Sequence, residues 1–482
     1  MIIRAARPLL LVWGLALYGQ DASLALRTSV TYNTQKSTLP LSESQRRQAD
    51  ELGRQAQQAS QAGKYGEALR DYYHGLAVMR GASWTPLLEL ASALQAHAAH
   101  SLVEPGNQVV VTLSPLYGTP PAEGVRLSAA AFLVPAGKEA GPLSLGSAVA
   151  VDPAALPLRI AAKVPETAAG DYKVEVRLTP GPASAAFVKS MPLHVEALAK
   201  DVQQLHARVA KLVKQNGPAL QSAEYALTLY DRADAGEIDP TRLHWRSEFA
   251  AANAILDDLD AGRDPFAHRR GDMRKAYRSS VDQQLQPYRL FIPESYDGSK
   301  PVPLVVALHG MGGDENSMFD SYGGTLKREA ARVGFAVVCP KGRDTASMYR
   351  GAAEQDVMAV LAEVRRDYQI DGQRIYLMGH SMGGFGTWSV AMDHPDVFAA
   401  LGPISGGGNP ANMAKISRIP EYVVHGDDDR TVPVTQSRTM VEAARKSGAH
   451  IVYVEVPGGS HTSVAAPQMG PMLDFFKSQA KP

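Results

Sequence analysis

Three side chains in the C-terminal third of the sequence have the types and order needed for nucleophilic attack on a carbonyl carbon. The first, Ser381, lies in the stretch Gly379-His380-Ser381-Met382-Gly383, which fits the pattern G-x-S-x-G. In that pattern the serine occupies a strained turn between a strand and a helix, and glycines leave room where the two elements cross. Residues 374–378 have the composition of a strand and residues 385–394 that of a helix. This position favours a nucleophile over an ordinary serine at the start of a helix.

A serine hydroxyl needs a base to take its proton and a carboxylate to orient that base. The carboxylate is expected between the serine and the histidine in the chain. Three consecutive aspartates, Asp427, Asp428 and Asp429, follow a strand-like run there. We predict Asp429 as the acid, because it stands third after the strand-ending Gly426 and precedes a Val-Pro pair. Asp427 is the alternative.

The predicted base is His461, which closes the glycine-rich loop 457–461 after another strand-like run. It must be neutral to accept a proton, so we expect activity to rise through about pH 6 to 8, as for an ordinary histidine. Four other histidines precede a glycine, the serine or a proline and are predicted to shape loops: His309, His380, His394 and His425.

The oxyanion formed during such an attack requires preorganised donors. We predict two backbone amides: that of Met382, which follows the nucleophile, and that of Met311, in the loop 309–313 after an apolar run. Gly312 is the alternative to Met311. This chemistry requires no metal or organic cofactor, and we expect none.

Strand-like and helical segments alternate around these residues. Seven strands are expected: 288–292, 304–308, 336–339, 374–378, 399–404, 421–424 and 450–456. Continuous Val, Ile and Leu runs between helices predict a mostly parallel sheet with helices on both faces. Functional residues in such sheets gather at the carboxyl ends of the strands.

The stretch from Tyr288 to His461 resembles the secreted esterase branch of the α/β-hydrolase superfamily. The resemblance rests on the motifs YRLFIP, PLVVALHGMGG, EQDV, DGQRIYLMGHSMGGFGTW and VVHGDDDRTVP. They are similar to polyhydroxybutyrate-depolymerase-like, feruloyl and phospholipase/carboxylesterase-type enzymes, and to prolyl oligopeptidase catalytic domains. The resemblance implies hydrolysis of carboxylic esters through an acyl-serine, with Ser381, Asp429 and His461 as the triad and Met311 and Met382 as oxyanion donors.

Departures from the family bear on the substrate. The segment between the helix after Ser381 and the strand before Asp429 is filled by one strand and one loop, so no large lid is expected. An open site permits bulky or polymer-linked esters. Specificity is expected in the loops 343–350 and 406–416. Repeated four-stranded units, as in the propeller of prolyl oligopeptidases, are not found upstream.

The N-terminal part is predicted to form separate modules. Residues 43–101 have a helical composition, 104–198 consist of short β-type runs between Pro and Gly, and 199–280 are helical again. The middle region predicts an immunoglobulin-like β-sandwich. The chain is therefore expected to be multidomain, with the α/β-hydrolase domain at 283–482.

The beginning of the chain resembles an export signal. Two arginines precede the apolar run 8–18, which has the length of a signal-peptide core and is too short to span a bilayer. We therefore expect 1–25 to be a signal peptide, no transmembrane anchor, and a periplasmic or secreted protein. The 49 basic residues balance the 49 acidic ones, which argues against nucleic acid as a partner.

Two further functions remain open from the sequence. The same triad also serves serine peptidases of the prolyl-oligopeptidase type. A third possibility is a scaffold in which the β region contacts a polysaccharide and hydrolysis is accessory.

Overall fold

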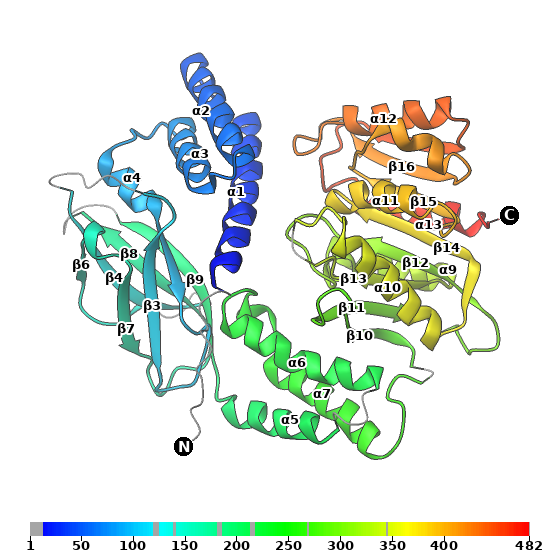
Figure 1. Ribbon diagram of the computed structural model, residues 1–482, viewed down its shortest axis with the longest axis horizontal. Coiled ribbons are helices and arrows are strands. Elements are labelled where there is room, and N and C mark those ends of the chain that lie inside the picture. Colours follow the sequence, from blue (N-terminus) through cyan, green and yellow to red (C-terminus); the bar gives the residue numbers. More distant parts are fainter. Residues whose placement is uncertain are drawn as a thin grey trace, which may run out of the picture. The chain divides into compact units, whose positions relative to one another are not determined.

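The computed structural model describes residues 13–118, 125–137, 141–180, 186–212, 217–267, 269–343 and 346–481, with only the backbone for 13–21 and 23. The chain divides into two compact units (Figure 1). One contains Met1–Gln203 with Leu229–Arg246, and the other contains Gln204–Thr228 with Ser247–Pro482. Each is described by itself below.

The first unit begins with four helices, α1 (Trp13–Thr38), α2 (Glu43–Gln61), α3 (Tyr65–Met79) and α4 (Pro86–Ala93). Ser42 starts α2 with a capping box, since its side chain accepts from the Gln45 amide while the Gln45 side chain accepts from the Ser42 amide. Tyr32 and Tyr72 are buried where α1, α2 and α3 pack together. The predicted export signal lies partly outside the described residues; its remainder forms the start of α1.

Two sheets follow in the first unit. One has the strand order β1 (Leu94–Ala98), β3 (Gln108–Pro115), β7 (Leu158–Lys163); the other has the order β2 (Leu102–Val103), β9 (Phe187–Val195), β8 (Gly170–Thr179), β4 (Leu127–Pro135), β5 (Leu143–Ser144), with β6 (Val149–Val151) beside β4. Side chains of both sheets share one core, including Val111, Leu133 and Val176. The prediction of a helical region over 43–101 is wrong at its C-terminal end, because Leu94–Ala98 forms a strand that pairs with β3. The immunoglobulin-like form of this region stays a prediction.

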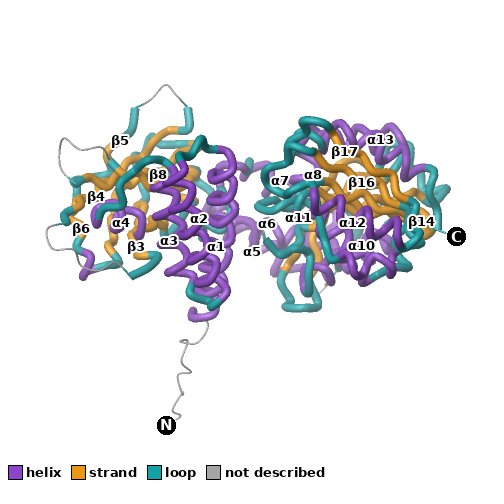
Figure 2. Tube along the Cα trace, turned by 90° about the horizontal axis from the view of Figure 1, so that it is seen from above, coloured by secondary structure: helices purple, strands orange, loops and turns teal. Residues whose placement is uncertain are grey.

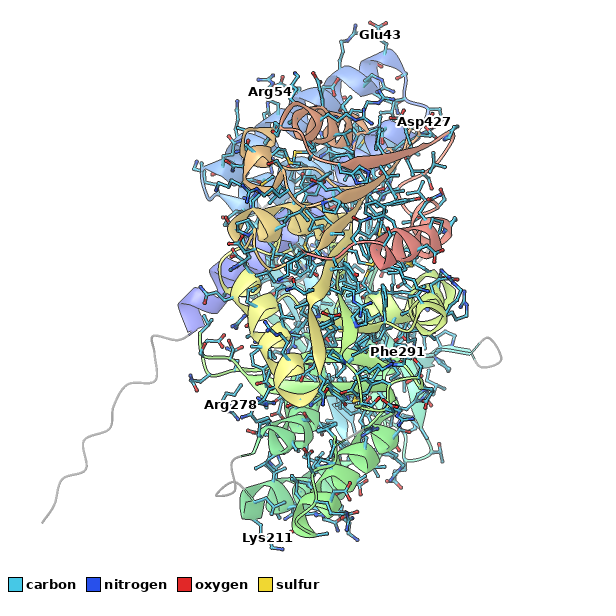
Figure 3. All side chains as sticks on the ribbon, turned by 90° about the vertical axis from the view of Figure 1, so that its right-hand side faces the viewer. Glu43, Arg54, Lys211, Arg278, Phe291 and Asp427 are labelled. Carbon is cyan, nitrogen blue, oxygen red and sulfur yellow. The ribbon has the colours of Figure 1, made fainter. Side chains whose placement is uncertain are left out.

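Three helices follow the two sheets in the sequence: α5 (Ala199–Leu212), α6 (Pro218–Asp234) and α7 (Trp245–Asp260). Leu205, Val209 and Leu212 are the buried residues of α5 and stand three or four residues apart on one of its faces. The predicted helical region 199–280 is again too long, because Gly271–Arg278 forms strand β10. It pairs antiparallel with the next strand, Leu285–Ile292, and adds an edge strand to the sheet of the second unit. Arg278 at its end is labelled in Figure 3.

The second unit is built on an eight-stranded sheet of order β10-β11-β13-β12-β14-β15-β16-β17. Its strands after β10 are β11 (Leu285–Ile292), β12 (Val302–Leu308), β13 (Ala336–Pro340), β14 (Ile370–His380), β15 (Ala400–Ile404), β16 (Glu421–Gly426) and β17 (Ile451–Val456). Pairing is antiparallel up to β13 and parallel from there to β17. The predicted mostly parallel sheet is confirmed.

Helices cover both faces of this sheet, which explains why every residue of β12 is buried. On one face, α9 (Thr325–Val333) and α13 (Ala465–Lys477) pack with Phe335 and Tyr376. On the opposite face from α13 lie α10 (Ala352–Asp367) and α12 (Thr435–Lys446) (Figure 2), and α11 (Met382–Asp393) packs on β14 and β15. No helix among the described residues has the length and apolarity to cross a membrane.

Candidate active site

Ser381 occupies the sharp turn between β14 and α11. Its φ of 58° lies in the left-handed region, which costs a side-chain-bearing residue energy and therefore needs support from its surroundings. Its backbone N–H donates to the Ile404 carbonyl at 2.9 Å, which ties the turn to β15. A Cβ on Gly383 would collide with the Leu308 carbonyl, so only glycine allows α11 to approach β12 this closely.

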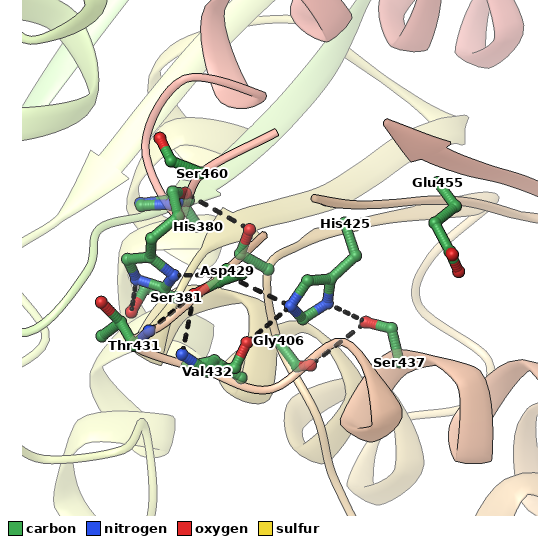
Figure 4. A network of polar contacts seen from close by, with 12 residues as sticks. His380, Ser381, Gly406, His425, Asp429, Thr431, Val432, Ser437, Glu455 and Ser460 are labelled. Atoms are coloured by element: carbon green, nitrogen blue, oxygen red, sulfur yellow. Dashed lines mark hydrogen bonds and ion pairs between the residues drawn. The ribbon is translucent and has the colours of Figure 1, made fainter. Parts of the chain in front are cut away.

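The structure brings the three predicted residues together, two of which, Ser381 and Asp429, are labelled in Figure 4. Ser381 Oγ lies 2.8 Å from His461 Nε2, and His461 Nδ1 lies 2.7 Å from Asp429 Oδ2. A carboxylate can only accept, so Nδ1 carries the hydrogen and Nε2 is left to accept from the serine. This is the geometry by which a neutral imidazole removes a hydroxyl proton.

Asp429 is the most firmly held member of the set. Its Oδ1 accepts from the Thr431 and Val432 amides, each at 2.9 Å. Burial alone would raise the pKa of Asp429, but hydrogen bonds from His425, His461 and the Val432 amide outweigh it and hold the pKa well below its usual range. Asp429 is therefore ionised at neutral pH.

The three consecutive aspartates have different surroundings. Asp427, labelled in Figure 3, accepts from the Gly458 amide at 2.6 Å and so holds the loop that carries His461. Asp428 pairs with Arg430, and both side chains are more than half exposed. Only Asp429 lies at hydrogen-bond distance from the imidazole.

The loop after β12 lies against the turn at Ser381. A Cβ placed on Gly310 would be 3.4 Å from Ser381 Cβ. Within the described part of the chain, neither the Met311 nor the Met382 amide has an intramolecular acceptor. Both predicted donors are thus free to bind a ligand oxygen, as an oxyanion hole requires.

His380, the residue before Ser381, contacts the backbone of His461. His380 Nε2 lies 2.8 Å from the His461 carbonyl oxygen, and its Nδ1 lies 2.8 Å from the Tyr322 hydroxyl. Burial, then the charge of His461, lowers the pKa of His380 to about 4, so it stays neutral. The N–H on Nε2 donates to the carbonyl, and Tyr322 donates to Nδ1. The sequence predicted only loop shaping for His380 and gave no sign of Tyr322, because their contact joins distant segments.

The loop 343–350, predicted to affect specificity, is fixed at both ends, while 344 and 345 lie outside the described residues. Arg343 forms an ion pair with the buried Asp356 of α10. Tyr349 is fully buried, and its hydroxyl accepts from the His309 amide at 2.9 Å. The Tyr349 contact holds the chain just after β12, where the loop with Met311 begins.

Nothing in the described ranges forms a cluster of three or more His, Cys, Asp or Glu side chains able to hold a metal ion.

Comparisons with known proteins concern mainly this part of the chain. Residues 344–420 match the prolyl oligopeptidase family. A probable feruloyl esterase C of Aspergillus oryzae is 28% identical over 186 residues, which are 37% of this chain and 68% of that protein. A bifunctional acetylxylan esterase/xylanase of Neocallimastix patriciarum is 34% identical over 132 residues, 26% of this chain and 19% of that protein.

Among solved structures, a thermostable esterase is 17% identical with a TM-score of 0.41, covering 80% of this chain and 100% of the other. The family match and the two relatives support what the sequence predicts for this part of the chain, an α/β-hydrolase serine esterase and hence a carboxylic-ester hydrolase.

Proposed function

We propose that this chain is an exported esterase in which Ser381, His461 and Asp429 cleave carboxylic esters through an acyl-serine intermediate. The observation that carries the proposal is the unbroken hydrogen-bond chain from Ser381 Oγ through both nitrogens of His461 to Asp429. The contacts run in the order that proton removal from the serine requires.

In the first half of the reaction Ser381 Oγ attacks the ester carbonyl carbon, and its proton passes to His461 Nε2. The carbonyl oxygen takes up negative charge and is stabilised by the Met311 and Met382 amides. As the intermediate collapses, the bond to the alcohol oxygen breaks and His461 gives its proton to that oxygen. Ionised Asp429 stabilises the transient imidazolium.

In the second half a water molecule takes the place of the alcohol. His461 removes a proton from the water, whose oxygen attacks the acyl carbon. The bond to Ser381 Oγ then breaks, the serine regains its proton from His461, and the carboxylic acid leaves. No step requires a group outside the chain other than ester and water.

We propose that the substrate is an ester formed by acetic acid or a small aromatic acid with a bulky or polymeric alcohol. The two relatives support this choice, being named a feruloyl esterase and an acetylxylan esterase/xylanase. An open site also supports it: between α11 and β16 the chain forms only β15 and the short helix Pro410–Ile416, which leaves no lid domain.

Hydrolysis of a panel of esters tests the proposal. Purified protein is assayed with p-nitrophenyl esters from acetyl to palmitoyl, methyl ferulate and acetylated xylan, beside Ser381→Ala and Ser389→Ala. Ser389 lies on the same helix but bonds only to the Gly386 carbonyl, so it is the matched control. We expect turnover of acetyl or feruloyl esters in the wild type and the control, and a loss on the order of 10⁶-fold in Ser381→Ala. Full activity without Ser381 would rule the mechanism out.

A serine peptidase is the second candidate, favoured by the match of 344–420 to the prolyl oligopeptidase family. The same triad cleaves amides, so the substrate and not the residues must decide. A prolyl anilide added to the panel separates the two: hydrolysis of the anilide at a higher kcat/KM than any ester would make the chain a peptidase.

For the N-terminal part we propose a supporting module over 104–198 of immunoglobulin-like type, with polysaccharide contact as the alternative. Binding of full-length Ser381→Ala to insoluble xylan or cellulose, compared with a variant lacking 104–198, tests the alternative.

Export is supported by the apolar run after Arg4 and Arg7. Recovery of the cleaved protein outside the cytoplasm of the producing cells would establish it.

A further inference from the structure

A second histidine contacts the acid of the proposed triad. His425 lies near the end of β16, and none of its surface is exposed. Its Nε2 lies 3.2 Å from Asp429 Oδ2, the same oxygen that faces His461, and 2.9 Å from the Val432 carbonyl oxygen. Its Nδ1 lies 2.7 Å from Ser437 Oγ on α12 (Figure 4).

These partners fix which nitrogen carries the hydrogen. Both oxygens at Nε2 can only accept, so Nε2 is protonated and its hydrogen is shared between the carboxylate and the Val432 carbonyl. Nδ1 of the neutral ring is then an acceptor, so the Ser437 hydroxyl donates to it, and the Gly406 carbonyl lies 3.2 Å from the same hydroxyl. The contact with Ser437 therefore keeps the ring hydrogen on Nε2, where it faces Asp429.

We propose that His425 is a positioning residue for the reaction, which orients Asp429 and tunes its charge through an N–H bond to Oδ2. The inference rests on the proposed esterase function. The loop amides hold only Oδ1. Without His425, His461 would be the sole donor to Oδ2 among the described residues. The carboxylate of Asp429 could then rotate more freely about its Cβ–Cγ bond. Ser437 keeps the His425 ring in the plane that reaches Oδ2.

The bond also has an electrostatic consequence. A donor on Oδ2 draws negative charge from the oxygen that stabilises the His461 imidazolium. Removing the donor leaves that oxygen more negative, which favours protonated His461. The acid limb of the pH profile then moves to higher pH.

Two other ionisable groups near His425 and Asp429 do not contribute to the expected shift of the pH profile. His380, whose ring centroid is 4.8 Å from that of His461, stays neutral because burial lowers its pKa to about 4. Glu455 lies opposite His425 on β17, and hydrogen bonds from Arg438 and then Tyr453 lower its pKa to about 2. Neither changes charge between pH 5 and 9.

Two substitutions at one position separate positioning from packing. His425→Leu fills the space but removes both nitrogens. His425→Gln places its amide nitrogen where Nε2 stands and keeps a donor to Asp429. His394→Leu is the control, since that histidine pairs with Glu354 at a distance from the triad. Circular dichroism and thermal unfolding check that each variant folds.

For His425→Leu we expect kcat to fall about ten- to hundredfold, as is common for partners of catalytic side chains, with little change in KM. The pH of half-maximal kcat/KM should rise by about half to one unit. His425→Gln should recover most of kcat and the wild-type pH profile. A folded His425→Leu with unchanged kcat and profile would overturn the proposal, as would equal loss in the Leu and Gln variants without a pH shift.

The rate of labelling by a fluorophosphonate probe is measured for each variant as well. This reaction needs an activated Ser381 but no ester turnover. A wild type that is labelled but hydrolyses no ester would contradict the proposed function while still allowing the His425 comparison. Labelling that is slower in His425→Leu and restored in His425→Gln would support the positioning role on its own.

Discussion

Strand β16 has a buried carboxyl group near each end, and the two behave in opposite ways. Glu421 is the first residue of the strand. Trp388 Nε1 donates to its Oε2 at 2.7 Å, while Oε1 is buried and has no hydrogen-bond partner among the described residues. Burial raises the pKa of Glu421 from 4.5 to about 7. Asp429, just beyond the other end, has two amides and two histidines around it, and its pKa is lowered despite burial.

The donors decide the direction of each shift, because burial acts to raise the pKa of both carboxyl groups. At the carboxyl end of a parallel strand, loops present backbone N–H groups and side chains that stabilise a charge. The amino end of β16 offers Glu421 only a tryptophan N–H. A shifted pKa in a buried carboxyl is therefore not enough to mark a catalytic residue. Several donors around an ionised carboxylate distinguish Asp429 from Glu421 and fit the role that we propose for it.

The largest effect should come from a substitution of Asp429, beyond the carboxyl end of β16. In Asp429→Asn an amide faces His461 Nδ1 and favours the tautomer with hydrogen on Nε2, which cannot accept from Ser381. We expect kcat to fall on the order of 10³- to 10⁴-fold with the fold intact. Steady-state kinetics on the best ester of the panel measures it. A loss smaller than tenfold would show that Asp429 does not orient the base.

A substitution of Glu421, at the amino end of β16, should change the stability of the protein. Because the folded state raises the pKa of Glu421, its contribution to stability is complete below the unfolded value of 4.5 and is lost as pH rises through about 7. Glu421→Gln cannot ionise and keeps an acceptor for Trp388. We expect the variant to gain about 2 to 3 kcal/mol over the wild type between pH 5 and pH 8.

Urea denaturation of both proteins across this pH range gives the difference in unfolding free energy, and the ester assay gives activity. Activity at pH 7 should be unchanged. A constant stability difference at all pH values would mean that Glu421 does not titrate in this range. For Asp429 the sign is opposite, since its contribution is lost in acid.

Much of the site follows from the sequence, for physical reasons. The glycines around Ser381 are needed wherever a helix crosses a strand closely, so the pattern predicts the turn itself. The chain order of serine, aspartate and histidine corresponds to loops after β14, β16 and β17. The continuous apolar runs also predicted the parallel strands, although their exact ends differ by one or more residues.

The supports of the site were not predictable. His380 and His425 stand next to motif residues, but Tyr322 and Ser437 reach them only through tertiary contacts. Strand β10 was missed because Arg274 and Lys275 stand four and three residues before Arg278, which is the spacing of one face of a helix. Lys275 is nevertheless buried, with its charge paired to Asp367.

The smallest effects should distinguish the three aspartates of the loop. Asp427→Ala removes the acceptor of the Gly458 amide and loosens the loop of His461, so we expect kcat to fall about threefold. Asp428→Ala removes an exposed ion pair and should leave kcat unchanged. Steady-state kinetics on both variants, measured side by side, shows which substitution lowers kcat more. If Asp427→Ala lost as much activity as Asp429→Asn, the acid would be assigned to the wrong residue.

The identity of the nucleophile is tested most directly by trapping the acyl-enzyme. Protein mixed with p-nitrophenyl acetate is quenched in acid during turnover, digested and analysed by mass spectrometry. The account predicts an acetyl group on Ser381 in the peptide that contains residues 379–384, and no acetylated peptide in Ser381→Ala. Acetylation at another residue, or turnover in Ser381→Ala at the wild-type rate, would contradict it.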